Sequence, residues 1–443
     1  MRTEVDSRTT RRLERLLAEA RTYLPTQPPW PPVAATAPGV NAILSGRWLT
    51  RPVESTATAL VTISKENPWI RAFVVTLPET AMEHARQLEE QPSSSPVYGM
   101  PVAVKDLFDV AGTPTLAGSN VPDRTKAKAD SLLVQRLEAR GAVIVGKTAT
   151  HEFAFGVSGE PVRNPRAPER IPGGSSSGSA AAVAAGMVPA ALGTDTAGSV
   201  RIPAACCGVV GLKPTHGILP KEGIMPLSWS LDHPGILART VTEAAWVLGA
   251  LAQMPTARPG VTRIGVPANW DGAIPPQETL YRLKALGLTI TTVTLPDLTL
   301  LHHISRVIIL AEAAAYHAPW LEQRAQLYTP DVRDRLELGL LVPAKAYINA
   351  QRLRTEVIRQ LDAVLQQVDA IATPTLPAPP PERGEKADHL IQFVGPFNVT
   401  GHPAISVPCG PLTGLQLVGR RGDDATLLRL AASFERGEPQ WAK

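Results

Sequence analysis

The chain has 443 residues, 44% hydrophobic and 19% charged, a composition that excludes a disordered protein and supplies a sizeable core. The formal net charge is +4, and the basic residues occur singly or in pairs, which argues against a nucleic-acid-binding surface. The uncharged segment 171–194 is dominated by Gly, Ser, Ala and Pro and is too polar for a membrane span, so neither nucleic acid nor membrane is an expected partner.

Cysteine usage is typical of a reducing compartment. The three cysteines are Cys206 and Cys207, which are adjacent, and the remote Cys409, so no disulfide or zinc-ligand spacing exists. The N-terminus lacks the apolar core of a signal peptide. We therefore expect a cytoplasmic protein.

Along the chain, helical and strand patterns alternate. The first pattern is a helix at residues 7–24, followed by a proline-rich connector at 25–38. Further segments predict a helix at 78–91, a strand at 101–105, a helix and strand within 130–147, a strand and turn within 189–204, a strand–helix–strand unit within 262–295, a helical region at about 300–367, a strand within 368–381, strands at 403–410 and 414–420, and a helix at 424–435.

This alternation predicts an α/β fold with a large, open, mixed and twisted β-sheet flanked by helices on both faces. No internal repeat or clean linker interrupts the pattern. We expect an N-terminal helical layer at residues 1–60, packed on a single globular unit at residues 61–443.

Two familiar motifs match the sequence in the wrong structural context. Residues 141–148, GAVIVGKT, fit the P-loop pattern, but the central Ala-Val-Ile-Val must form a strand rather than a phosphate-binding turn. Residues 174–178, GSSSG, fit a nucleophile elbow with Ser176 at its centre. The preceding NPRAPERIP cannot form the strand that such an elbow requires, so Ser176 is not the expected nucleophile.

A second glycine-containing turn is more informative. In Thr196, Ala197, Gly198 and Ser199, successive backbone N–H groups can point into one concavity, as an oxyanion hole requires. Glycine at 198 lets a substrate approach the backbone closely. An ordinary Gly-Ser turn is the alternative for this segment taken alone.

A serine nucleophile needs a base, and Lys105 is a candidate because it ends an otherwise apolar strand. A free lysine is almost fully protonated at neutral pH, but burial lowers the pKa because it disfavours the ammonium form. The alternative is a strand-end lysine that faces solvent.

Taken together, the sequence resembles the amidase signature family. The similar blocks are GMPVAVKDLFDVAGTPTLAGS, PGGSSSGSAAAVAAGMVPAALGTDTAGSVRIPAACCGVVGLKPTHG, PLSWSLDHPGILARTVTEAA, VDAIATPTLPAP, and PFNVTGHPAISVPCG with GLQLVGR. They occur in the family's order from about residue 60 to residue 436. The resemblance implies the family's fold and the cleavage of a carboxylic acid amide to an acid and ammonia or an amine.

The resemblance also implies a Ser–cis-Ser–Lys triad and an acyl-enzyme. Ser199 matches the nucleophile, Ser175 the bridging serine, preceded by a cis peptide bond, and Lys105 the base. The N–H groups of residues 196–199 would hold the oxyanion, and no metal or cofactor is required. The expected partner is a small-molecule amide. Homodimers are common in the family, and the sequence leaves the oligomeric state open.

Three further residues match supporting positions. The resemblance implies that Asp195 and Arg201 brace the nucleophile turn by an ion pair, and that Ser176 supports the site. Ser176 and Ser177 are expected to cap the following helix, with Gly186 as its stop. The sequence departs from the family at Ala197, where a glycine is usual, and at Ala149, where an asparagine is common.

The main alternative is the ammonia-producing subunit of glutamine-dependent tRNA amidotransferase, which has the same triad blocks and passes ammonia to a partner. That subunit usually carries an Asp that binds the glutamine amino group, where this chain has Ile391. An apolar side chain cannot pair with an ammonium group, so a stand-alone linear-amide hydrolase is preferred. A non-catalytic homologue is disfavoured because all three triad positions are intact. Specificity is expected from residues 113–125, 224–232 and 300–350.

Overall fold

The computed structural model describes residues 51–437, and residues 1–50 and 438–443 lie outside the described part. The helix expected at 7–24 and the connector after it therefore lie outside the described residues. The boundary expected between residues 60 and 61 falls inside helix α2 (Pro52–Ile70). The N-terminal layer stays a prediction.

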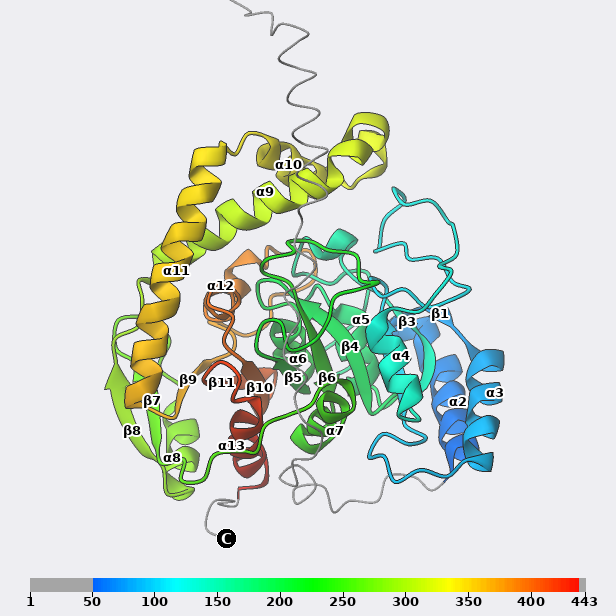
Figure 1. The fold of residues 1–443 in the computed structure, drawn as a ribbon, viewed down its shortest axis with the longest axis horizontal. Coiled ribbons are helices and arrows are strands. Elements are labelled where there is room, and N and C mark those ends of the chain that lie inside the picture. The colour runs from blue at the N-terminus through cyan, green and yellow to red at the C-terminus, as the bar shows by residue number, and fades with distance from the viewer. Residues whose placement is uncertain (1–50, 438–443) are drawn as a thin grey trace, which may run out of the picture. The chain divides into compact units, whose positions relative to one another are not determined.

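One mixed sheet organises the described residues (Figure 1). Its eleven strands, counted over residues 51–437, are β1 (Phe73–Thr76), β2 (Pro101–Lys105), β3 (Val143–Thr148), β4 (Ala190–Asp195), β5 (Val210–Lys213), β6 (His233–Ala238), β7 (Arg263–Pro267), β8 (Thr289–Val293), β9 (Ala370–Pro374), β10 (Ala404–Gly410) and β11 (Thr413–Val418). Their spatial order is β1-β3-β2-β4-β6-β5-β10-β11-β9-β7-β8. Because β2 is parallel to β3 and β4, the carboxyl ends of these three strands meet at one edge, where open α/β sheets bind ligands.

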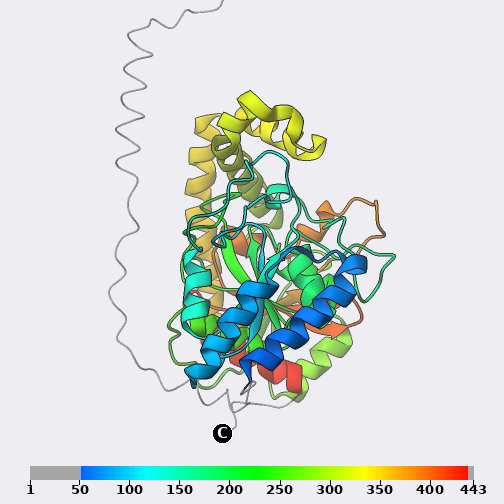
Figure 2. The same ribbon diagram turned by 90° about the vertical axis from the view of Figure 1, so that its right-hand side faces the viewer.

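Helices cover both faces of the sheet. After α2 they are α3 (Pro78–Glu90), α4 (Leu132–Ala139), α5 (Ser177–Ala184), α6 (Arg201–Cys207), α7 (Val241–Leu251), α8 (Gln277–Ala285), α9 (Leu298–Arg324), α10 (Pro330–Leu340), α11 (Ala344–Gln367), α12 (Pro396–Val399) and α13 (Asp424–Arg436). On β2, Val102 and Val104 belong to one buried cluster, with α4, α7 and α13, whereas Ala103 belongs to another, with α2, α3 and α5. Figure 2 shows α2 and α3 side by side. The predicted α/β fold with two covered faces is confirmed.

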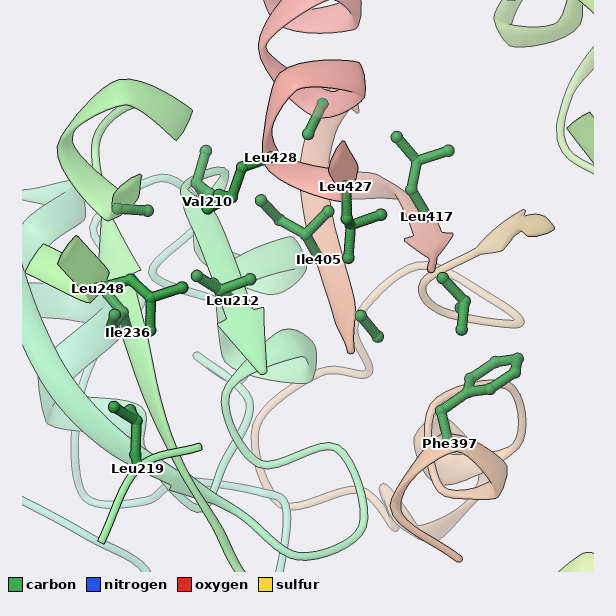
Figure 3. Packing of buried hydrophobic residues seen from close by; sticks show 14 of the residues in the cluster. Val210, Leu212, Leu219, Ile236, Leu248, Phe397, Ile405, Leu417, Leu427 and Leu428 are labelled. Carbon is green, nitrogen blue, oxygen red and sulfur yellow. The ribbon is translucent and has the colours of Figure 1, made fainter. Parts of the chain in front are cut away.

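The larger core forms where α7 and α13 pack on the centre of the sheet. Figure 3 shows side chains of β5 and β10 directed toward those of α13, among them Val210, Leu212, Ile405, Leu427 and Leu428. All of these are buried. Each such side chain contributes roughly 1.5–3 kcal/mol when it leaves water, so this packing fixes the middle strands on which the site is built.

Most predicted elements are present, and one prediction needs correction. The region 300–367 is three helices, not one stretch, because Pro330 occupies the first turn of α10 and Pro343 precedes α11. Proline lacks the N–H that would continue a helix, so each proline starts a new helix. The sequence did not predict α2, β1, β5, β6 or α7. The rejected P-loop segment is strand β3, as expected.

Helix α9 is also the one helix in the described part of the chain that is long and apolar enough, with the turn after it, to cross a membrane. Half of its most apolar window is buried inside the protein. That burial is typical of a core helix of a globular domain.

Candidate active site

Lys105 and Ser175 are brought together at the carboxyl edge of the sheet. Lys105 ends β2, and Ser175 lies in the loop before α5. The Lys105 Nζ donates hydrogen bonds to Ser175 Oγ at 2.7 Å and to Thr194 Oγ1 at 2.8 Å. The Gly174–Ser175 peptide bond is cis, as expected. Thr194 precedes the last residue of β4, and no motif in the sequence pointed to it.

Ser199 lies in the turn between β4 and α6, beside Ser175. Its carbonyl oxygen accepts a hydrogen bond from the Ser176 N–H at 3.2 Å, which holds the two loops together. Within residues 51–437 its hydroxyl makes no hydrogen bond, so it is not joined to Ser175 in this structure. Hydrogen bonds of this kind often tighten only when substrate binds.

Burial sets the protonation of Lys105. Its side chain is fully buried, and desolvation lowers the pKa of its ammonium group from 10.5 to about 7. The negative charges of Asp195 and Asp232 oppose this shift without cancelling it. Lys105 is therefore poised to exchange a proton near neutral pH, unlike an exposed lysine.

The expected oxyanion turn is tightly shaped at Gly198. This residue has φ +118°, and a Cβ placed there would lie 2.2 Å from Val394 Cγ2, so only glycine fits. The Gly198 N–H donates to Asp195 Oδ1 at 2.8 Å and is thereby committed to the carboxylate. In the described part of the chain, the N–H groups of Thr196, Ala197 and Ser199 make no hydrogen bond. Three of the four expected donors are thus free to meet an oxyanion.

Asp195 and Arg201 form the expected ion pair, fully buried, with Arg201 Nη2 2.8 Å from Asp195 Oδ1. Arg201 also donates to Gln416 Oε1 and Asn398 Oδ1, both at 2.7 Å, and Asn398 returns a bond to Asp195 Oδ1 at 2.8 Å. Burial alone would raise the pKa of Asp195, but Arg201 and its hydrogen bonds, with Lys213, hold it below its ordinary value. This network anchors the nucleophile turn to β11 and α12.

We expect Arg201→Ala to lower the free energy of unfolding by about 3–5 kcal/mol, because it leaves Asp195 as an unpaired buried charge. Urea unfolding followed by tryptophan fluorescence measures the loss. Arg359→Ala is the control, since it removes an exposed pair with Glu356 and should leave the midpoint unchanged. A wild-type midpoint for Arg201→Ala would contradict the bracing role.

The expectation that Ser176 and Ser177 cap α5 through their hydroxyls is wrong. Ser176 occupies the N-cap position without a side-chain cap bond; its hydroxyl instead donates to the Thr194 carbonyl at 3.2 Å and accepts from the Thr194 N–H at 3.3 Å. The Ser177 hydroxyl is buried without a partner in the described residues. Gly186 does follow the helix end with φ +70°, as expected for a stop.

The Ser199 turn opens onto a cavity of about 550 Å³. Its walls come from residues 154–157, helix α9 and residues 388–395, with Leu227 between them. Apolar side chains such as Ile309 and Leu310 alternate with polar ones such as His302. The expected contribution of residues 300–350 is thus present, whereas no residue of 113–125 lines this cavity.

Two side chains in the wall bear on amine recognition. Ile391 lines the cavity, so the position at which glutamine-dependent relatives usually carry Asp faces this space. Asp388 also lines it, but its Oδ1 lies 3.5 Å from Arg335 Nη2 and is paired there. Within residues 51–437, no group of three or more His, Cys, Asp or Glu side chains is arranged to hold a metal ion.

Comparison with known proteins gives a consistent pattern. The family model described as Amidase matches residues 54–272 and 273–428. An amidase of Pseudomonas putida is 40% identical over 429 residues, covering 87% of this chain and 92% of the relative. A glutamyl-tRNA(Gln) amidotransferase of Chloroflexus aurantiacus, through its A-type subunit, is 37% identical over 452 residues, covering 87% of this chain and 93% of the relative.

Solved structures agree with this. A crystal structure of an amidase superposes with a TM-score of 0.81 at 33% identity, covering 90% of this chain and 98% of the other. A 6-aminohexanoate cyclic dimer hydrolase superposes with a TM-score of 0.78 at 28% identity, covering 88% and 94%.

Proposed function

The chain belongs to the amidase family of amide-hydrolysing enzymes, and we propose that it cleaves the C–N bond of linear carboxylic acid amides through an acyl-enzyme on Ser199. The observation that carries this proposal is the fully buried Lys105, hydrogen-bonded to Ser175 at 2.7 Å. A buried lysine with its pKa near 7 is partly neutral at physiological pH and can act as a base.

The reaction then proceeds in two stages. As the Ser199 oxygen attacks the amide carbon, its proton passes through Ser175 to the neutral Lys105, and free N–H groups of residues 196–199 stabilise the oxyanion. The proton returns to the leaving nitrogen, the C–N bond breaks, and ammonia or an amine departs. Water then attacks the acyl-enzyme, gives its proton to the same relay and releases the acid and free Ser199.

We also propose that the protein works in the cytoplasm without an ammonia-accepting partner. Cys206, Cys207 and Cys409 are free thiols, which is typical of a reducing compartment. The alternative, an A-type amidotransferase subunit, has support from relatives of that name. Against it stands Ile391 in the cavity wall, because an ammonium group without a carboxylate partner binds poorly.

We expect the purified chain alone to release ammonia from neutral linear amides, with kcat/KM for free glutamine at least about tenfold lower. An ammonia-release assay over an amide panel, including a cyclic amide, measures this. Ile391→Asp should raise kcat/KM for glutamine, and the uncharged Ile391→Asn should not. Glutamine as the best wild-type substrate, or activity only with an added protein, would support the amidotransferase alternative.

A further inference from the structure

Asp232 is a buried carboxylate in contact with the expected oxyanion turn. Its Oδ1 accepts a hydrogen bond from Thr196 Oγ1 at 2.6 Å, and its Oδ2 accepts the N–H groups of Leu227 and Ser228, both at 3.0 Å. Burial raises the pKa of Asp232 to about 6, which leaves it mostly ionised at neutral pH. The carboxylate therefore fixes the Thr196 side chain three residues before Ser199.

The loop that carries Asp232 is held in turn by a buried glutamate on α9. Glu312 Oε2 accepts the Ser228 hydroxyl at 2.6 Å and the Ser230 N–H at 3.0 Å, and its Oε1 accepts the Ser230 hydroxyl at 2.6 Å. The Tyr347 hydroxyl donates to the same Oε1 at 2.8 Å. Glu312 is only 1% exposed, so this carboxylate is spent inside the protein rather than on a solvated helix face.

Helix α9 also lines the substrate cavity. Ile309 and Leu310, one turn before Glu312, form part of its wall, and Ser199 and Thr196 form another part. Hydrogen bonds thus run from the cavity-lining helix through the 228–232 loop to the turn that carries the expected oxyanion donors. Donors of this kind must be held to within about 0.5 Å of the productive position.

We propose that Glu312 and Asp232 are positioning residues for amide hydrolysis, acting through Ser228 and Thr196 to hold the oxyanion turn in register with α9. The inference rests on the proposed function of Ser199. Neither carboxylate touches substrate. Their effect is expected on transition-state stabilisation and therefore on kcat, not on ground-state binding.

The test is a double-mutant cycle on the amide that the screen identifies as the best substrate. Thr196→Val and Glu312→Ala should each lower kcat by roughly tenfold to a hundredfold, less than the loss of a whole oxyanion donor, with KM changed by no more than about threefold. If Glu312 acts through Thr196, Glu312→Ala should cost little more in the Thr196→Val background. Tyr347→Phe is the control: it removes one donor to Glu312 but leaves both serine contacts, and should keep wild-type kcat.

A purely structural role predicts something different. It would lower the unfolding temperature with multiplicative effects on kcat, and it would weaken a tetrahedral-adduct inhibitor, such as the matched trifluoromethyl ketone, no more than the acid product. The proposal predicts that only the inhibitor's affinity falls, in parallel with kcat. Either additive losses or an unchanged inhibitor affinity would overturn it. If Glu312→Ala does not fold, Ser230→Ala carries the same test.

Failure of this proposal is distinguishable from failure of the proposed function. Wild-type protein that neither releases ammonia nor reacts with a fluorophosphonate at Ser199 would refute the function itself. Active wild-type protein whose Thr196→Val and Glu312→Ala variants keep full kcat would refute only the positioning role.

Discussion

Replacing Ser199 by alanine is expected to lower kcat by roughly 10⁴- to 10⁶-fold, the range seen when a hydrolase loses its nucleophile. No acyl-enzyme can form without the Ser199 oxygen, and only binding and the free N–H groups of the turn remain to assist attack by water. Ammonia release measures the loss. Intact-mass analysis after fluorophosphonate treatment should show one adduct on the wild type and none on the variant.

Ser177→Ala is the matched control for this experiment. Ser177 belongs to the same run of three serines as Ser175, and its buried hydroxyl has no partner within residues 51–437. Removing an unpaired buried hydroxyl costs little, so activity and labelling should stay at the wild-type level. Activity in Ser199→Ala, together with a fluorophosphonate adduct on Ser176, would instead support the nucleophile-elbow interpretation of residues 174–178.

The sequence predicted the residues of this site better than their hydrogen bonds. Lys105 ends an apolar strand and Ser199 follows one, so ordinary strand patterns bring both to the same sheet edge. The place of Ser177 before an alanine-rich helix favours a cap. That rule cannot anticipate that the neighbouring Ser176 hydroxyl bonds to β4 instead. Such choices depend on tertiary neighbours, not on local sequence.

The missed elements and residues have similar causes. Strand β6 begins with His-Pro, and β5 has only four residues, so neither shows a clear alternating pattern. Glu312 lies 84 residues from Ser228, and a glutamate on a helix ordinarily indicates a solvated face. Its burial became evident only from the way α9 packs. The prolines at 330 and 343, by contrast, were visible signals that the helical region is divided.

Replacing Lys105 by methionine is expected to lower kcat by roughly 10³- to 10⁴-fold while the protein stays folded. Methionine fills similar space without a charge or a proton acceptor, so Ser199 would lose its base and Ser175 its donor at 2.7 Å. Ammonia release gives the rate, and thermal unfolding confirms the fold. Lys105→Arg should be equally inactive, because a guanidinium keeps the charge but does not lose its proton in this pH range.

The pH dependence separates a base from a fixed charge at this position. With its pKa lowered to about 7 by burial, Lys105 is protonated below that pH and cannot accept the Ser199 proton. Wild-type kcat/KM should therefore rise as pH increases through about 7 and level off above it, and the rate of fluorophosphonate labelling should follow the same curve. A rate that falls over this range would show that the ammonium form is the active one. A flat profile between about pH 5.5 and 9 would place the base elsewhere, since no exposed lysine titrates so low.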